Sequence, residues 1–123
     1  MYQKIFIVGH CGSNPEMRFT PNGDPVTTFS VATSRKAGDK DETTWFRVTV
    51  WNKQAESCNQ YLHKGSKVLV EGRLRPDESG NPTVFQRKDG SWGASYEVTA
   101  ETVRFLTPKG EENAAAVDEE YPF

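Results

Sequence analysis

The sequence TWFRVTVW at residues 44–51 is followed by KQAESCNQYLHK at 53–64 and by SKVLVEGRLR at 66–75. The first and third segments are rich in alternating β-branched and aromatic residues, which predicts two strands. In the middle segment apolar residues recur at helical spacing, and Gly65 stands where a helix C-terminal cap belongs. The chain therefore contains a strand, a helix and a strand in succession.

This helix is the only convincing one in the sequence. Its apolar residues Ala55, Cys58 and Leu62 fall at i, i+3 and i+7, so we expect them to face the core. Elsewhere the pattern predicts short strands separated by turns. We expect these strands at residues 4–9, 16–20, 26–34, 83–88, 91–96 and 96–106, with a charged loop at 36–42 and a hairpin turn at Asp89-Gly90.

Many short strands with one short helix between the third and fourth indicate an all-β fold, with the strand at 16–20 as a small excursion. A five-stranded Greek-key barrel of the OB-fold type is built this way. A β-sandwich is the alternative, but the helix favours a barrel because it can close one open end. We expect one folded domain at residues 1–107 and a disordered tail at 108–123, which is polar and lacks apolar periodicity.

The charges are unevenly divided between these two parts. Residues 1–108 carry 14 Lys and Arg against 12 Asp and Glu, whereas residues 109–123 carry one Lys against five acids. A mildly basic body suggests an anionic ligand, and an acidic tail suggests a cationic partner. No apolar run approaches the length of a membrane span, and Cys11 and Cys58 are isolated. We therefore expect a soluble cytoplasmic protein with reduced thiols and no membrane association.

The strand at 44–51 presents two different faces. Phe46, Val48 and Val50 point one way and form a core face, whereas Trp45, Arg47, Thr49 and Trp51 point the other way. Exposed aromatic rings interleaved with cations are what single-stranded nucleic acid needs, since bases stack on the rings and cations neutralise phosphates. The alternative for each indole is burial under a loop or in a subunit interface.

Further cations and aromatic residues surround this strand. The additional candidates for nucleic-acid contact are Lys4, Arg35, Lys36, Lys53, Lys64, Arg73, Arg75, Phe85, Arg87, Lys88 and Trp92. For any one of these cations, a solvated surface charge is the commoner role.

No catalytic constellation is recognisable. The two histidines have no obvious partners, there is no phosphate-binding loop or HExxH motif, and the acids lie mostly in loops and in the tail. We therefore expect a protein that is not an enzyme and that binds neither metal nor cofactor.

The sequence ends in an acidic and aromatic tip. This candidate partner-binding segment consists of Asp118, Glu119, Glu120, Tyr121, Pro122 and Phe123, and we expect Phe123 to carry a free carboxylate. A flexible acidic segment with an apolar end predicts binding to a partner that has a basic, apolar pocket. Most acidic tails, however, serve only solubility.

Several ordered motifs resemble those of the bacterial single-stranded DNA-binding protein family. They are Val8-Gly9, Asn14-Pro15-Glu16, Arg18-Phe19, Pro21-Asn22-Gly23, Phe29-Ser30-Val31-Ala32-Thr33, Thr44-Trp45-Phe46-Arg47-Val48, Tyr61-Leu62-His63-Lys64-Gly65 and Glu71-Gly72-Arg73-Leu74. The resemblance covers about residues 1–106 and resumes at the tip.

The resemblance implies an OB-fold homotetramer that wraps single-stranded DNA in the bacterial cytoplasm, in association with the nucleoid. It also implies roles in replication, recombination and repair, with genome-maintenance proteins recruited by the tip. The residues that it places on DNA are Trp45, Arg47, Trp51 and Phe85, with Lys4, Lys53, Lys64 and Arg75 on phosphates.

Three other functions remain open. They are a dimeric OB-fold accessory protein of replication restart, an OB-fold adaptor whose exposed aromatics bind protein, and a metal-dependent enzyme acting on DNA. The tip argues against the first, and the lack of clustered acids argues against the last.

Overall fold

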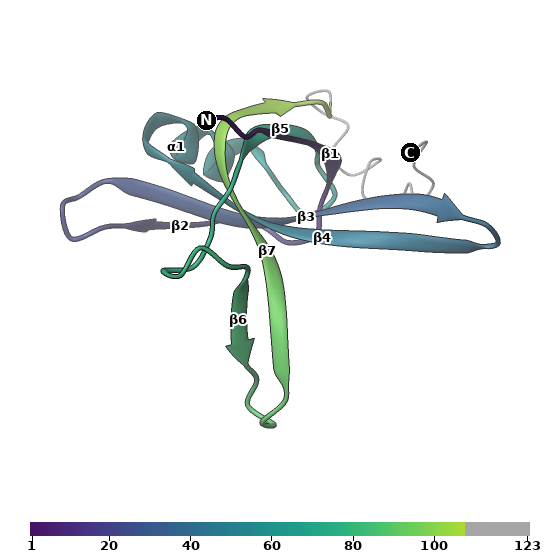
Figure 1. Ribbon diagram of the computed structural model, residues 1–123. Helices are drawn as coiled ribbons and strands as arrows, with labels where there is room; N and C mark the ends of the chain where they lie inside the picture. The colour runs from purple at the N-terminus through teal and green to yellow at the C-terminus, as the bar shows by residue number, and fades with distance from the viewer. Residues whose placement is uncertain (108–123) are drawn as a thin grey trace.

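The computed structural model of the protein describes residues 1–107 (Figure 1). In chain order its elements are β1 (Ile5–Cys11), β2 (Glu16–Phe19), β3 (Pro25–Ala37), β4 (Lys40–Trp51), α1 (Asn52–Tyr61), β5 (Lys67–Leu74), β6 (Thr83–Gln86) and β7 (Trp92–Phe105). Within these residues, no helix combines the length and the hydropathy that crossing a lipid bilayer requires.

Five of the strands close into a barrel. They pair in the order β1-β5-β7-β4-β3, and β3 returns to β1 through His10–Ala32 and Cys11–Val31. The β4–β7 pair is parallel, and the other pairs are antiparallel. The predicted OB-fold is confirmed, with α1 between the third and fourth barrel strands. The β-sandwich alternative is wrong, because the β1–β3 pairing joins the two edges of the sheet.

Alternating side chains fill the barrel. Val48 and Val50 of β4 and Val68 and Val70 of β5 are nearly inaccessible to solvent and belong to one apolar cluster. The three residues predicted to face the core are buried: Ala55 and Cys58 in α1, and Leu62 directly after it. The helix is also attached to β3, where the Thr27 hydroxyl donates a 2.6 Å hydrogen bond to the Ala55 carbonyl oxygen.

The predicted charged loop at 36–42 is wrong. β3 continues to Ala37 and β4 starts at Lys40, so only Gly38 and Asp39 form the turn, with Gly38 at φ +69°. The charges pair across the two strands instead, since Arg35 Nε lies 3.1 Å from Glu42 Oε1. Opposite charges at facing positions stabilise a hairpin, which explains why a charged stretch is extended here.

The helix is shorter than predicted. It ends at Tyr61 rather than Lys64, and Leu62 already has an extended backbone. Gly65 is therefore not its cap. It adopts φ +96° in the following turn, where its N–H donates to the Cys11 carbonyl oxygen at 2.7 Å. The glycine thus joins the end of β1 to the start of β5.

β6 and the first residues of β7 project from the barrel as a two-stranded hairpin, residues 83–95, which we call the arm (Figure 1). The two strands predicted at 91–96 and 96–106 are one continuous strand. The turn is also wider than Asp89-Gly90, since Arg87 N–H donates to the Ser91 oxygen and Gly90 N–H to the Arg87 oxygen. β7 is bulged against β5, because Gly72 pairs with Ala100 and Glu71 with Thr102.

Candidate nucleic-acid interface

The outward face of β3 and β4 combines large and small side chains. Trp45 lies opposite Ala32, and Arg47 lies opposite Ser30. Residues that face each other in an antiparallel pair lie on the same side of the sheet. The large side chains of β4 therefore lie beside small side chains of β3. Trp45 is 55% exposed and Trp51 is 42% exposed. The prediction that both indoles lie outside the core is confirmed.

Thr49 differs from the other residues of this face. It is only 4% exposed, although it has the same parity as Trp45 and Trp51. Its position in β4 is flanked on both sides, by Thr28 of β3 and by Thr99 of β7. Thr49 therefore shares the parity of this face but is buried, whereas the two indoles and Arg47 are exposed as predicted.

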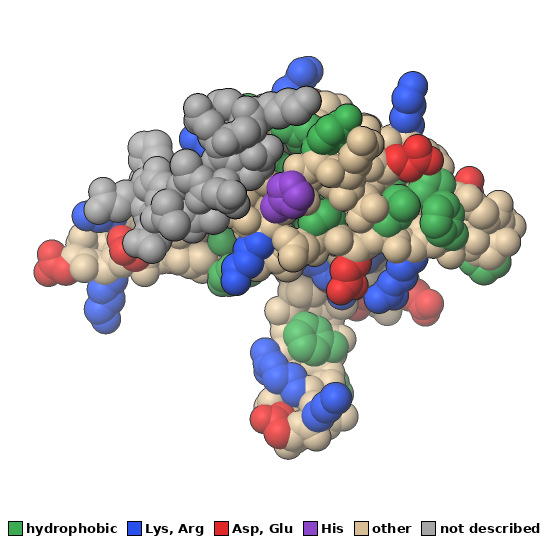
Figure 2. Space-filling view, turned by 180° about the vertical axis from the view of Figure 1, so that it is seen from behind, with side chains coloured by type: hydrophobic (Ala, Val, Ile, Leu, Met, Phe, Trp, Pro, Cys, Tyr) green, Lys and Arg blue, Asp and Glu red, His purple; other side chains and the backbone are tan. Residues whose placement is uncertain are grey.

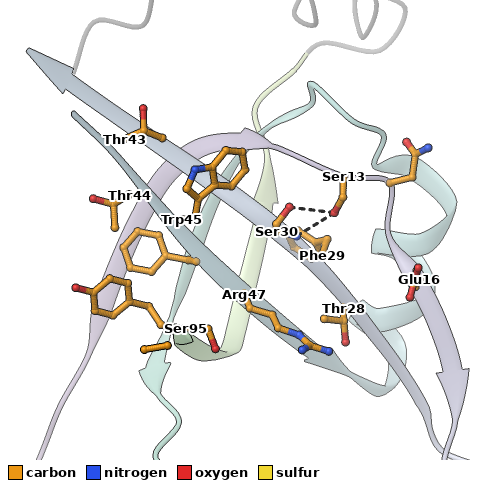
Figure 3. A pocket seen from close by; sticks show the side chains of 14 residues that line it. Ser13, Glu16, Thr28, Phe29, Ser30, Thr43, Thr44, Trp45, Arg47 and Ser95 are labelled. Atoms are coloured by element: carbon orange, nitrogen blue, oxygen red, sulfur yellow. Dashed lines mark hydrogen bonds between the residues drawn. The ribbon is translucent and has the colours of Figure 1, made fainter. Parts of the chain in front are cut away.

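A groove of about 640 Å³ runs along this face and reaches the root of the arm (Figure 3). This is within the roughly 300–1,000 Å³ typical of ligand-sized clefts. The residues that line it are Ser13, Asn14, Glu16, Thr28, Phe29, Ser30, Thr43, Thr44, Trp45, Phe46, Arg47, Ala94, Ser95 and Tyr96. Two of the predicted site residues, Trp45 and Arg47, are thereby brought together with an aromatic pair from β4 and β7.

This pair, Phe46 and Tyr96, was not predicted as part of a site. The two rings lie 5.7 Å apart between centroids, and Tyr96 is 58% exposed. Their strands are parallel neighbours in register at this point. One sequence signal pointed to Tyr96, because Trp92, Ala94 and Tyr96 alternate along one strand. The parallel pairing that places it beside Phe46 is a long-range contact that no local pattern reveals.

Arg47 has no carboxylate partner within residues 1–107. Glu97 is its neighbour in register on β7, but the Glu97 carboxylate is buried and already occupied. It accepts hydrogen bonds from Arg75 Nη2 at 2.9 Å and from Ser95 Oγ at 2.5 Å. The positive charge of Arg47 is thus available in the groove, whereas that of Arg75 is balanced at the root of the arm.

Two other predicted cations also have acidic partners. Lys4 Nζ lies 3.0 Å from Glu71 Oε1 and 3.1 Å from Glu101 Oε1. Hydrogen bonds to these carboxylates raise the pKa of Lys4 above its ordinary value, which keeps it charged. Arg35 pairs with Glu42. For Lys4, Arg35 and Arg75, a contact with DNA stays a prediction that would require exchange of an existing ion pair.

The arm carries a second cluster of aromatic and cationic side chains (Figure 2). The Arg87 guanidinium carbon lies 5.4 Å from the centre of the Phe85 ring, a cation–π contact. Arg87 Nη1 also donates to the Trp92 carbonyl oxygen at 2.7 Å. Phe85 faces Gly93, and Trp92 faces Gln86, so the two aromatic side chains lie on opposite sides of the hairpin.

The other predicted residues do not line the groove. They are Lys36, Trp51, Lys53, Lys64, Arg73 and Lys88, and their contacts with a ligand stay predictions. In the same part of the chain, residues 1–107, no three His, Cys, Asp or Glu residues are grouped so as to hold a metal ion. The partner-binding segment predicted at residues 118–123 lies outside the described residues.

Comparison with known proteins gives one consistent result. The Single-strand binding protein family matches residues 2–106. A "Single-stranded DNA-binding protein" of Neisseria meningitidis is 35% identical over 122 residues, covering 95% of this chain and 67% of that protein. A protein of the same name from Thermotoga maritima is 38% identical over 124 residues, covering 97% of this chain and 84% of its own length. A protein of this name from Bacillus cereus is 35% identical over 112 residues, covering 89% of this chain and 62% of its own length.

Proposed function

This chain belongs to the single-strand binding protein family, and on that basis we propose that it binds single-stranded DNA without sequence specificity. The observation that carries the proposal is the position of Trp45 and Arg47, two residues apart on one strand and lining one groove. An indole can stack on any base, at ~1–3 kcal/mol per base, and a guanidinium neutralises any phosphate. Neither interaction reads sequence, which is the property that a general coating protein needs.

The test is tryptophan fluorescence during titration with oligo(dT), at low and at high salt, with duplex DNA as the control. Stacking on Trp45 or Trp51 predicts strong quenching by the single strand only, and counterion release predicts that affinity falls as salt rises. The stoichiometry gives the number of nucleotides per protomer. Absence of both quenching and binding would instead favour the adaptor, whose exposed aromatics bind protein.

The proposal extends to the biological role. Coating of single strands fits DNA replication, recombination and repair in the bacterial cytoplasm, at the nucleoid, by a protein that carries out no reaction. We further propose a homotetramer. It is supported by large apolar side chains exposed outside the groove: Tyr2, Phe6, Tyr61, Phe105 and Leu106. Native mass spectrometry measures the number of protomers, and a monomer at micromolar concentration would refute this part.

The acidic tip is proposed to recruit genome-maintenance proteins. Its acids favour approach to a basic surface, and Phe123 supplies an apolar anchor. Affinity capture with the parent protein and with a Phe123→Ala variant, both loaded with oligo(dT), tests this proposal. We expect the variant to lose replication and repair proteins while its DNA affinity is equal or slightly higher. An unchanged set of captured proteins would contradict a role for the tip.

A further inference from the structure

We propose that Gly12 is a positioning residue for Trp45: the missing side chain of Gly12 makes the space in which the indole lies. This inference rests on the proposed function, because it assigns to Gly12 the ring position that stacking requires. Gly12 follows directly after β1, and its N–H donates to the Ser30 carbonyl oxygen on β3 at 3.0 Å. It therefore lies at the junction of β1 and β3, beside the groove.

A β-carbon on Gly12 would collide with the indole. It would lie 2.3 Å from Cζ3 and 2.9 Å from Cη2 of Trp45, and 3.1 Å from Ser30 Oγ. The backbone gives no reason for glycine here, since Gly12 is not among the glycines at positive φ. Gly9 and Gly72 serve another purpose, because a β-carbon on either would meet a backbone carbonyl oxygen of the neighbouring strand. At Gly12 it is the outer ring of Trp45 that requires the space.

The surroundings of Gly12 fix the surface on which the indole lies. Ser13 Oγ accepts a hydrogen bond from Ser30 N–H at 3.2 Å and lies 3.0 Å from Ser30 Oγ, which holds the loop after β1 against β3. Figure 3 shows the Trp45 side chain and this Ser13–Ser30 contact on the same side of β3 and β4. The opposite partner of Trp45 on β3 is Ala32, which is also small. The indole thus packs against β3 and Gly12 with one face, and its opposite face is open to the groove.

The consequence of a Gly12→Ala substitution follows from these distances. Because Trp45 is half exposed, the indole can turn away from β1 into solvent rather than disrupt the barrel. The displaced ring then blocks the groove or stacks poorly on a base. Phenylalanine at position 45 lacks the outer ring atoms that approach Gly12, so a Trp45→Phe substitution should remove the conflict.

The experiment uses four full-length proteins: the parent, Gly12→Ala, Trp45→Phe and the double variant. We expect Gly12→Ala to weaken oligo(dT) binding roughly tenfold, which lies within the range of one base stack. In the Trp45→Phe background the same substitution should change affinity less than twofold. Equal losses in both backgrounds, or no loss in either, would overturn the proposal.

A second readout does not depend on DNA. In proteins where Trp51 and Trp92 are replaced by Phe, Trp45 is the one tryptophan left, and excitation at the red edge of indole absorption selects it over the tyrosines. Gly12→Ala should then increase its quenching by acrylamide and shift its emission to longer wavelength. Unchanged quenching and emission would overturn the positioning role. If the parent does not bind oligo(dT), the proposed function fails and the stacking role fails with it, while altered quenching still shows that Gly12 places the indole. If Gly12→Ala does not fold, recovery of folding in the double variant supports the inference and lack of recovery contradicts it.

Discussion

At the scale of single residues, the surroundings of the arginines decide which of them can meet an anion. Arg47 lines the groove and has no carboxylate partner within residues 1–107, whereas Arg75 is held by the buried Glu97. A guanidinium without an ion-pair partner releases counterions from the DNA when it binds a phosphate. A guanidinium in an ion pair must first break the contact with its carboxylate. The salt dependence of binding therefore distinguishes the two kinds of arginine.

We expect an Arg47→Ala variant to bind oligo(dT) more weakly and with a smaller salt dependence. Loss of one phosphate contact lowers the slope of log K against log salt by about 0.7 for a single strand. Titrations at several salt concentrations measure this slope. Arg104, an exposed arginine of β7 outside the groove, is the matched control, and an Arg104→Ala variant should keep the parent slope. Equal reductions in both variants would show that only overall charge matters.

The two cysteines give a prediction about pH. Burial raises the pKa of Cys11 to about 12, with a smaller contribution from the Cys58 thiol, and burial raises the pKa of Cys58 to about 12. Their ordinary value is 9.0. Between these values the unfolded chain releases thiol protons that the folded chain keeps, so stability falls as pH rises above 9. Each thiol contributes about 1.4 kcal/mol to the loss between pH 8 and pH 10.

Urea unfolding at both pH values measures this loss. A Cys58→Ala variant is less stable at every pH because it leaves a cavity, but its additional loss between pH 8 and pH 10 should be smaller by about 1.4 kcal/mol. An identical loss in parent and variant would mean that the buried thiol does not titrate in this way.

At the scale of elements, a side chain of α1 supplies hydrogen bonds to the backbone of β7. The bulge in β7 leaves Glu101 out of register with β5. The Gln54 amide of α1 fills this gap: Nε2 donates to the Glu101 carbonyl oxygen at 2.7 Å, and Oε1 accepts from Val103 N–H at 2.8 Å. One side chain thus supplies both hydrogen bonds that a neighbouring strand would give, and it joins α1 to the barrel.

A Gln54→Met substitution keeps the length of the side chain but removes both hydrogen bonds. We expect the free energy of unfolding to fall by about 1–3 kcal/mol, mainly because the partly buried Val103 N–H loses its partner, whereas the Glu101 carbonyl oxygen is exposed and can accept from water. Thermal or urea unfolding measures the change. Gln60→Met, at an exposed position of the same helix, should change stability by less than ~0.5 kcal/mol. Similar losses in the two variants would show that helix propensity, and not the bulge, is responsible.

The elements also show what the sequence could predict. The helix and the core strands were predictable because burial imposes periodicity on their side chains, as at Val48, Val50 and Cys58. The extension of β3 and β4 through 36–42 was not predictable. Read along the sequence, a run of charged residues resembles a solvated loop, and only the strand pairing shows that the charges lie opposite one another. The aromatic pair of Phe46 and Tyr96 and the contact of Gly12 with Trp45 depend on long-range pairing, which local patterns do not contain.

At the scale of the whole molecule, a closed barrel supports an open arm. Each barrel strand has neighbours on both sides, whereas β6 pairs only with β7 in the described part of the chain. A two-stranded hairpin alone is marginally stable in water, so opening of the arm costs much less than opening of the barrel. The arm gains order from anything that binds to it.

Hydrogen exchange monitored by NMR tests this difference. We expect the amides of Thr83–Gln86 to exchange much faster than those of β5, and to slow down when oligo(dT) binds the Phe85 and Arg87 cluster. The β5 amides provide the internal reference in the free protein, since their protection reflects the stability of the barrel. Equal protection of arm and barrel in the free protein would contradict the independent opening of the arm.

The position of β7 in the barrel has a consequence for biosynthesis. Among the described residues β7 is the last strand, yet it lies between β4 and β5 and hydrogen-bonds to both. A nascent chain on the ribosome therefore carries two unpaired strand edges until residues 92–105 have emerged. Exposed edges of this kind pair readily with other chains. Premature termination or a stalled ribosome before β7 consequently yields aggregation-prone fragments, not a smaller functional domain.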